Sequence, residues 1–367
     1  MPLFIQYQPY KLQFKFEAGT SRGILTEKIS WFLKITDGEQ PGIIGYGECG
    51  PLNGLSIDAI PDFETKLIEI CRLFNSMDLE VFPFNLPIIL QQIIPYDYPS
   101  IRFGVETALL DFMNGGKKVH YPNTFSQKGS GIPINGLVWM GSEDFMNRQI
   151  EEKLSAGFTT IKMKVGAIDF DQECRILERI RARYSPKVIT LRVDANGAFT
   201  TADVHSKLNA LATFSIHSIE QPIATNQHEL LKELCGTSPI PVALDEELIG
   251  KMDYMAKFAL LKNILPPYII LKPTLLGGFQ QCKEWIEIAQ RLSIGWWMTS
   301  ALESNLGLNA IAQFTAQFDN ALPQGLGTGQ IYHNNLDSPL EIKLGNLYSN
   351  GTSPWDLSAL DGHWVNV

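Results

Sequence analysis

The chain has 367 residues, of which 45% are hydrophobic, 19% charged and 10% aromatic. This composition is typical of a globular protein and excludes a disordered chain, a collagen-like chain and a coiled coil. Because a single hydrophobic core stops growing at roughly 250 to 300 residues, the length predicts two domains, or one large α/β barrel with an attached part.

The charge balance is acidic, with 30 lysines and arginines against 39 aspartates and glutamates and a formal net charge of −9. Nucleic acids and anionic membranes bind positively charged surfaces, so neither is an expected partner. The five cysteines are scattered and include no CxxC pair, which favours a reducing compartment and argues against a zinc site. The sequence shows neither a signal-peptide pattern nor about 18 uninterrupted apolar residues. We therefore expect a cytoplasmic protein.

The first part of the chain, residues 1–125, has the pattern of an α+β unit. Short β-rich runs alternate with turns, namely QYQPYKLQFKF, GILTEKISWFLKI and IIGYGECGP. This alternation predicts an antiparallel sheet with one buried face. Helical patterns follow at residues 62–77 and 100–114.

The second part, residues 126–340, repeats one pattern eight times. The predicted strands are IPINGLV, TTIKMKV, VITLRVDA, SIHSIEQP, IPVALDEE, YIILKPT, GWWMTSA and the weaker LPQGLG. Polar residues at the ends of the second to seventh strands lie 25 to 30 residues apart, the length of one strand, one crossover helix and two short loops. Eight buried parallel strands predict a (β/α)₈-type barrel, and the missing GxGxxG argues against a dinucleotide fold. Residues 341–367 are expected to pack back on the first part.

Five successive predicted strands end in ionisable residues. A single carboxylate after a strand is more often a helix N-cap or a solvated group, but that explanation does not account for five strands in a row. Reactive groups of a barrel lie at the C-terminal strand ends. The candidate functional residues are therefore Lys162, Lys164, Asp194, Glu220, Asp245 and Lys272.

The three carboxylates Asp194, Glu220 and Asp245 come from adjacent strands and should converge on one point. Three neighbouring anions repel one another unless a cation lies among them. Carboxylate oxygens without histidine or cysteine select Mg²⁺ or Mn²⁺ over zinc. Because Glu246 and Glu247 follow directly, the third ligand can be displaced by one residue, and strand alternation favours Asp245.

The lysines lie on both sides of this expected metal site. Lys162 and Lys164 are two positions apart and point to the same face, so each raises the cost of protonating the other and lowers the lysine pKa toward that of a general base. Lys272 comes from the far side. The arrangement fits abstraction of a proton α to a carboxylate whose enolate is held by the metal.

These motifs resemble the enolase superfamily, in particular its muconate-lactonizing subgroup. IKMKVG resembles the KxK strand, LRVDANGAF, IEQPI and ALDEE resemble the three metal-ligand strands, and ILKPTLLGG resembles the strand of the second catalytic lysine. The resemblance implies a modified (β/α)₇β barrel with an N-terminal α+β capping domain. It also implies Lys164 and Lys272 as catalytic residues and Mg²⁺, or Mn²⁺, as the cofactor.

Within the subgroup, the segments SALESNLGLNAIAQFTA, LPQGLGTGQIY and INGLVWMG resemble those of members that dehydrate 2-succinyl-6-hydroxy-2,4-cyclohexadiene-1-carboxylate to 2-succinylbenzoate in menaquinone or phylloquinone biosynthesis. This resemblance implies a small carboxylate substrate, with Lys164 removing the α-proton and Lys272 stabilising the enediolate. The alternative is an N-succinylamino acid racemase or dipeptide epimerase with the same lysine pair. Gly-Leu-Gly in the eighth strand differs from the paired aspartates of dipeptide epimerases.

Further candidates concern substrate binding. Arg192 shares the inward face of Asp194 and either orients substrate or neutralises a buried acid. Ser300 and Glu303 have the spacing of a helix capping box, which is compatible with substrate contact. Arg22 lies in FEAGTSRGI, which is either a hairpin turn or a lid that closes over the substrate. The complete set of substrate-binding candidates is Lys162, Asn196, Arg192, Ser300 and Arg22. The sequence leaves a monomer and a homo-oligomer equally open.

Overall fold

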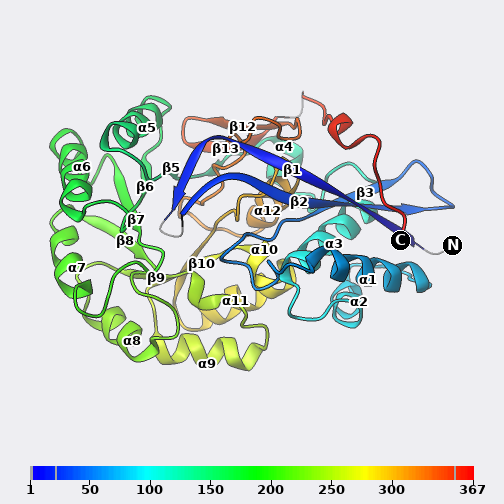
Figure 1. Ribbon diagram of the computed structural model, residues 1–367, viewed down its shortest axis with the longest axis horizontal. Coiled ribbons are helices and arrows are strands. Elements are labelled where there is room, and N and C mark those ends of the chain that lie inside the picture. Colours follow the sequence, from blue (N-terminus) through cyan, green and yellow to red (C-terminus); the bar gives the residue numbers. More distant parts are fainter. Residues whose placement is uncertain (1–2, 21–22, 351–352) are drawn as a thin grey trace.

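A computed structural model describes residues 3–20, 23–350 and 353–367 (Figure 1). A small antiparallel sheet with helices α1 to α3 lies beside a ring of parallel strands, which the green and yellow helices surround. We refer to the first part as the cap and to the second as the barrel.

The cap is built on a long β-hairpin. Its sheet has the order β1-β2-β3 and consists of β1 (Leu3–Thr20), β2 (Gly23–Asp37) and β3 (Ile44–Cys49). Helices α1 (Phe63–Ser76), α2 (Leu86–Ile93) and α3 (Pro99–Met113) cover one side of it. Helix α3 lies so close to β3 that a Cβ atom at Gly47 would be 2.0 Å from the carbonyl oxygen of Gly104. Helices α1 and α3 agree with the sequence prediction, whereas α2 was not predicted.

The barrel contains seven hydrogen-bonded parallel strands in chain order. They are β5 (Gly136–Val138), β6 (Thr160–Lys164), β7 (Thr190–Asp194), β8 (Ile216–Glu220), β9 (Val242–Leu244), β10 (Tyr268–Leu271) and β11 (Gly295–Met298). The helices between and after them are α5 (Glu143–Ser155), α6 (Phe170–Arg183), α7 (Val204–Ala212), α8 (His228–Thr237), α9 (Tyr254–Ile264), α10 (Pro273–Leu276), α11 (Phe279–Arg291) and α12 (Asn305–Thr315).

The predicted eighth strand is reduced to isolated parallel bridges. Gln324 bridges to Ile134, and Gly325 bridges to Thr299, so this segment closes the ring between β5 and β11. Glycine weakens a strand because it gains no side-chain packing and loses more backbone entropy. Gly325 also lies against Thr299, whose Oγ1 would be 2.5 Å from a Cβ atom there.

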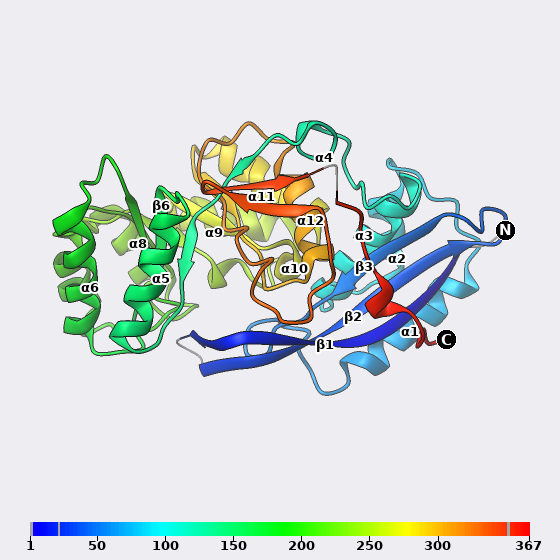
Figure 2. The same cartoon turned by 90° about the horizontal axis from the view of Figure 1, so that it is seen from above.

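The C-terminal segment contacts both parts. Strands β12 (Leu340–Lys343) and β13 (Asn346–Ser349) form a small sheet with β4 (Ile132–Pro133), which the short helix α4 (Thr124–Lys128) precedes. Farther on, Val365 bridges to Tyr7 of β1, and Figure 2 shows this red segment beside the blue cap strands. The domain bounds 1–125, 126–340 and 341–367 stay a prediction. Among the described residues, no helix is long and apolar enough to cross a membrane.

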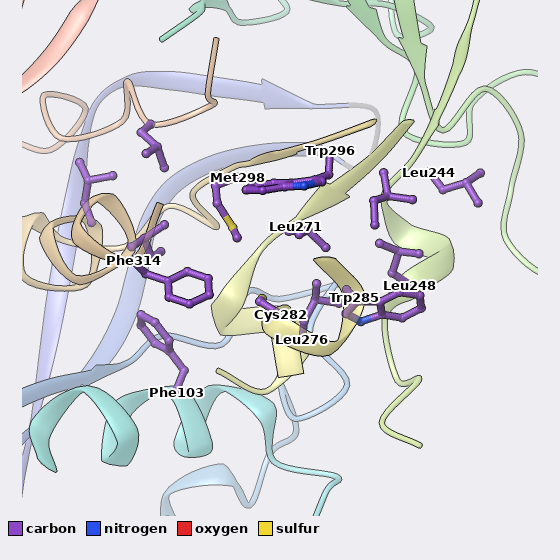
Figure 3. Close-up of a cluster of buried hydrophobic side chains, with 14 of the residues drawn as sticks. Phe103, Leu244, Leu248, Leu271, Leu276, Cys282, Trp285, Trp296, Met298 and Phe314 are labelled. Carbon is purple, nitrogen blue, oxygen red and sulfur yellow. The ribbon is translucent and has the colours of Figure 1, made fainter. Parts of the chain in front are cut away.

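The cap and the barrel share a hydrophobic core. In Figure 3, Phe103 of α3 faces the same cluster as Phe314 of α12 and Met298 of β11. The ring of Phe103 also packs edge-on against Phe279 of α11, with 5.4 Å between the centroids. Burial of such aromatic side chains dominates core energetics. The cap therefore packs against the barrel, next to the end that carries the candidate site.

Candidate active site

The ionisable residues predicted from the strand ends lie together inside the barrel. Lys164 pairs in register with Asp194, and Asp194 with Glu220, so these residues occupy one level of β6, β7 and β8. Asp245 directly follows β9, and Lys272 follows β10. All six candidate side chains are buried, with their residues between 1% and 8% exposed. Since β6 and β10 are separated by three strands in the sheet, Lys164 and Lys272 reach the centre from opposite sides.

Direct ion pairs connect the lysines to the carboxylates. Lys162 Nζ lies 2.5 Å from Glu220 Oε2 and 2.9 Å from Asp194 Oδ2. Lys164 Nζ lies 3.1 Å from Asp194 Oδ2. Lys272 Nζ pairs with Asp245 Oδ2 and is 3.9 Å from Glu220 Oε1. The cluster thus contains three lysine side chains and three acidic side chains in direct contact.

The three lysines differ in the direction of their pKa shifts, because their surroundings differ. Burial lowers the pKa of Lys164, and the Lys162 ammonium lowers it further, against the attraction of Asp194. Burial acts in the same direction on Lys162 and Lys272, but neighbouring carboxylates outweigh it and raise both pKa values above the ordinary lysine value. The sequence analysis expected each lysine of the KxK strand to lower the pKa of the other. The structure agrees with this for Lys164 alone. Lys164 is the lysine best able to become a neutral amine.

The carboxylates provide a donor set that suits a hard divalent cation. Burial and the charges of Asp194 and Asp245 raise the pKa of Glu220 to about 8. Its Oε1 atom is buried and accepts no hydrogen bond. Within the described residues, no three acidic, histidine or cysteine side chains form a ready-made metal cage, because lysine ammonium groups lie between the carboxylates. Three oxygen ligands from adjacent strands and one unsatisfied oxygen nevertheless fit Mg²⁺.

Asn196 lies beside Lys164. Lys164 Nζ donates a 2.6 Å hydrogen bond to Asn196 Oδ1, and Asn196 Nδ2 donates to Glu246 Oε1 at 3.0 Å. The backbone of Asn196 has φ 45°, a left-handed conformation that asparagine tolerates better than most residues. Asn196 therefore orients the Lys164 side chain, and it also lines the cavity.

The other three predicted substrate-binding residues differ in their relation to the cavity. Arg192 donates to the carbonyl oxygen of Pro323 at 2.7 Å and stacks 4.0 Å over the Trp297 ring. It is not among the residues that line the cavity. Ser300 does line the cavity, whereas Arg22 lies outside the described residues.

The expected capping box at Ser300 and Glu303 is wrong. Helix α12 begins at Asn305, and its N-cap is Ser304, whose side chain accepts from the amide of Leu306. Ser300 Oγ instead donates to Glu303 Oε2 at 2.6 Å, and Thr274 Oγ1 donates to the other Glu303 oxygen. Glu303 lies before the helix, and its carboxylate accepts from these two hydroxyl groups.

A cavity of about 130 Å³ lies above the ionic cluster. Its floor carries Lys162, Lys164, Asp194 and Lys272. Its walls come from four segments, namely Gly23–Leu25 of the cap hairpin, Leu52, Asn53 and Leu55 of the cap loop, Asn135, Leu137 and Trp139 of the first barrel unit, and Thr299–Leu302 with Gly325, Gly327 and Thr328 of the last units. The cap-loop residues were missed, because nothing in PLNGLS distinguishes a substrate wall from an ordinary turn.

Comparisons with known proteins fit this geometry. A family model described as "Enolase C-terminal domain-like" matches residues 146–351. An o-succinylbenzoate synthase from Desulfotalea psychrophila is 43% identical over 92% of this chain and 96% of its own length. The chain belongs to the o-succinylbenzoate synthase family of the enolase superfamily.

Solved structures agree with this family and with its fold. The crystal structure of MenC from Desulfotalea psychrophila has a TM-score of 0.81 and 40% identity, and covers 95% of this chain and all of that one. A dipeptide epimerase from Enterococcus faecalis, solved as a complex with Mg and the dipeptide L-Leu-L-Tyr, has a TM-score of 0.82 at 22% identity, covering 96% of this chain and 98% of that one. The predicted enolase-type barrel with an N-terminal cap is confirmed.

Proposed function

We propose that the protein converts 2-succinyl-6-hydroxy-2,4-cyclohexadiene-1-carboxylate to 2-succinylbenzoate by syn elimination of water. The observation that carries this proposal is the pair Lys164 and Lys272, which line one cavity together with Asp194 and come from opposite sides of the barrel. The 43% identity to an o-succinylbenzoate synthase over nearly the full length supports the reaction class, a carbon–oxygen lyase.

Lys164 acts as the general base. Burial and Lys162 lower its pKa, which favours the neutral amine that accepts a proton. It takes the proton from the carbon that bears the carboxylate, and the released electron pair becomes part of the new double bond. The resulting ammonium group returns the proton to the departing hydroxyl, which leaves as water. Asn196 accepts a hydrogen bond from Lys164 Nζ and so orients the amine.

Lys272 acts electrostatically from the opposite side. Asp245, Glu220 and Glu246 raise its pKa despite burial, which favours the ammonium form of its side chain. A fixed positive charge next to developing negative charge lowers the barrier without reorganisation. The same charge contributes a cation–π interaction as the ring becomes aromatic.

Asp194, Glu220 and Asp245 would hold Mg²⁺. When bound, this ion supplies positive charge that stabilises the negative charge developing on the substrate carboxylate. For the cation to enter, the Lys162 and Lys272 ammonium groups must release part of their contacts with these carboxylates. Mn²⁺ has the same preference for oxygen ligands and is expected to substitute.

The cavity walls suit a cyclic hydrocarbon. Leu25, Leu52, Leu137 and Trp139 present apolar surface to the space above the floor, and such surface orients a ring and excludes water. Gly325 and Gly327 carry no carboxylate where a dipeptide's α-ammonium group would need one. This favours the dehydration over dipeptide epimerisation.

The test is turnover of the diene carboxylate by the purified protein with Mg²⁺, followed as loss of diene absorbance. We expect multiple turnovers and release of 2-succinylbenzoate. Deuterium exchange at the α-carbon of N-succinyl amino acids, measured in D₂O by mass spectrometry, is the parallel assay. Exchange without any diene turnover would replace the lyase proposal with the racemase alternative.

A further inference from the structure

A second buried lysine system lies outside the catalytic cluster, at the contact between cap and barrel. Lys28 of β2 is 5% exposed. Its Nζ donates to the carbonyl oxygen of Leu302 at 2.9 Å and to that of Ala301 at 3.4 Å. Both acceptors belong to the cavity wall. A cap side chain therefore holds the backbone of a barrel loop that borders the substrate space.

The loop that Lys28 holds has a strained backbone. Leu302 has φ 64°, a left-handed conformation that is unusual for a residue other than glycine, asparagine or aspartate. Such a conformation persists only where several contacts enforce it. Here the Leu302 carbonyl accepts from Tyr332 Oη at 2.7 Å as well as from Lys28, and its amide donates to Ser300 Oγ at 3.0 Å.

The neighbouring cap strand fixes the continuation of the same loop. Glu48 of β3 accepts from the amides of Ser304 and Gly307 and from the hydroxyl groups of Ser30 and Ser304. The charges of Glu48 and Glu303 also oppose the lowering of the Lys28 pKa that burial causes. The cap thus contacts residues 301–307 through two charged side chains, Lys28 and Glu48.

Two glycines leave room for these contacts. A Cβ atom at Gly50 would lie 2.6 Å from Lys28 Nζ, and one at Gly307 would lie 2.9 Å from Glu48 Oε2. Either side chain would displace the charged group from its partners. The close fit on both sides shows that the interface is built around the two charged side chains.

Lys28 also stands near a second wall of the cavity. It lies three residues along β2 from Leu25, and Gly23, Ile24 and Leu25 line the same cavity as Ala301 and Leu302. Since a β-strand changes its length little, the Lys28 contact sets the separation between the hairpin wall and the wall formed by Ala301 and Leu302.

We propose that Lys28 is a positioning residue that fixes these two walls relative to each other and so sets the affinity for the substrate ring. This inference rests on the proposed function for the identity of the substrate. Loss of Lys28 leaves Tyr332 as the remaining side-chain donor to the Leu302 carbonyl, and the strained loop relaxes away from the ring. The Lys164 and metal-ligand geometry, which comes from barrel strands, stays in place.

The experiment compares Lys28→Met with Lys257→Met. Lys257 is also buried, donates to Gln281 and pairs with Glu284, and does not line the cavity. We expect Lys28→Met to raise KM for the diene carboxylate about tenfold, as befits a lost hydrogen bond from a charged group, and to leave kcat within about threefold. Lys257→Met lowers Tm without changing KM. Tyr332→Phe, which removes the second donor to Leu302, raises KM by a smaller factor and serves if Lys28→Met does not fold.

Amide hydrogen exchange gives a readout that needs no substrate. In Lys28→Met, peptides covering residues 299–307 should exchange at least about tenfold faster, because local opening becomes easier, whereas the same peptides in Lys257→Met should not change. Unchanged exchange together with unchanged KM in both Lys28→Met and Tyr332→Phe would overturn the proposal. Absence of turnover by the wild-type protein would overturn the proposed function instead, and the exchange result would still decide on Lys28.

Discussion

Two buried charged regions of this molecule differ in what their carboxylates bond to. In the barrel site, Asp194, Glu220 and Asp245 pair with lysine ammonium groups. At the contact between cap and barrel, Glu48 accepts from backbone amides and serine hydroxyl groups, and Glu106 of α3 accepts from the amides of Phe279 and Gln280 in α11. Both regions are almost inaccessible to solvent.

The difference separates a reactive site from a structural one. A lysine side chain has several rotatable bonds, so its ammonium group can withdraw when a cation or substrate enters. Backbone amides at a helix start are fixed by the helix and cannot withdraw. Burial and charge therefore do not identify a catalytic centre by themselves.

The largest expected effect is on Lys164 in the reactive region. Lys164→Ala removes the base that takes the α-proton, and kcat/KM for the diene should fall by about 10⁴-fold or more, the upper range for a general base. Stopped-flow or steady-state loss of diene absorbance measures it. Lys257→Met controls for loss of a buried lysine elsewhere and should retain kcat. If Lys164→Ala kept activity within about tenfold of wild type, the base would be assigned wrongly.

The sequence predicted that the strand-end lysines and carboxylates lie together, because this signal is local and repeated. Each lysine or carboxylate ends an apolar strand, and parallel register then brings the strand ends to one level. The cap–barrel contact has no such signal. Lys28 and Leu302 are far apart in the chain, and alternation along β2 alone would place Ile29 inside, yet Ile29 is 44% exposed and Lys28 is buried. The barrel covers the face that the pattern marks as polar.

The helix α2 and the cap loop at Leu52 were missed for related reasons. Helix α2 has eight residues with a proline at its start, too short for a periodic pattern to stand out. Residues of the cap loop acquire their role only from facing the barrel. The eighth strand was predicted as the weakest, and it forms only bridges.

The structural region should show a pH-dependent effect at Glu106. Burial raises the pKa of Glu106 from 4.5 to about 7, against the Phe279 amide and the charge of Arg102, which lower it. Because the folded carboxyl holds its proton more tightly than the unfolded one, this residue makes the free energy of unfolding fall as pH rises from about 4.5 to about 7. A pKa shift of this size corresponds to a change of roughly 3 kcal/mol in the free energy of unfolding.

The measurement is urea unfolding of wild type and Glu106→Gln at pH 5 and pH 8. The amide side chain has no such titration, so the variant should gain roughly 3 kcal/mol relative to wild type between the two pH values. Other carboxyls contribute equally to both proteins and cancel. Parallel stability profiles would show that Glu106 keeps an ordinary pKa in the fold.

A metal effect of similar or slightly smaller size should be confined to the reactive region. A cation that binds only the folded protein at 100 times its Kd stabilises it by about 2.7 kcal/mol. We expect Mg²⁺ to raise Tm and EDTA to reverse the increase. Glu220→Gln should lose this response, whereas Glu106→Gln should keep it. A Tm of wild type that does not respond to Mg²⁺ would contradict the assignment of the three carboxylates.

The smallest expected effect is at Ser300, which joins the two regions. Its hydroxyl group lines the cavity, yet the hydrogen is donated to Glu303 and the oxygen accepts from Thr328 Oγ1 at 2.8 Å and from the Leu302 amide. With these contacts satisfied, Ser300 supports the strained loop rather than the substrate. Ser300→Ala removes the neutral hydrogen bond from the Leu302 amide and should therefore raise KM only about threefold to fivefold, about 1 kcal/mol, with kcat unchanged. A rise of a hundredfold would instead mean that the hydroxyl turns to the substrate during binding. Ser300 would then belong to the substrate-binding site, and Glu303 would be the first residue of the structural region.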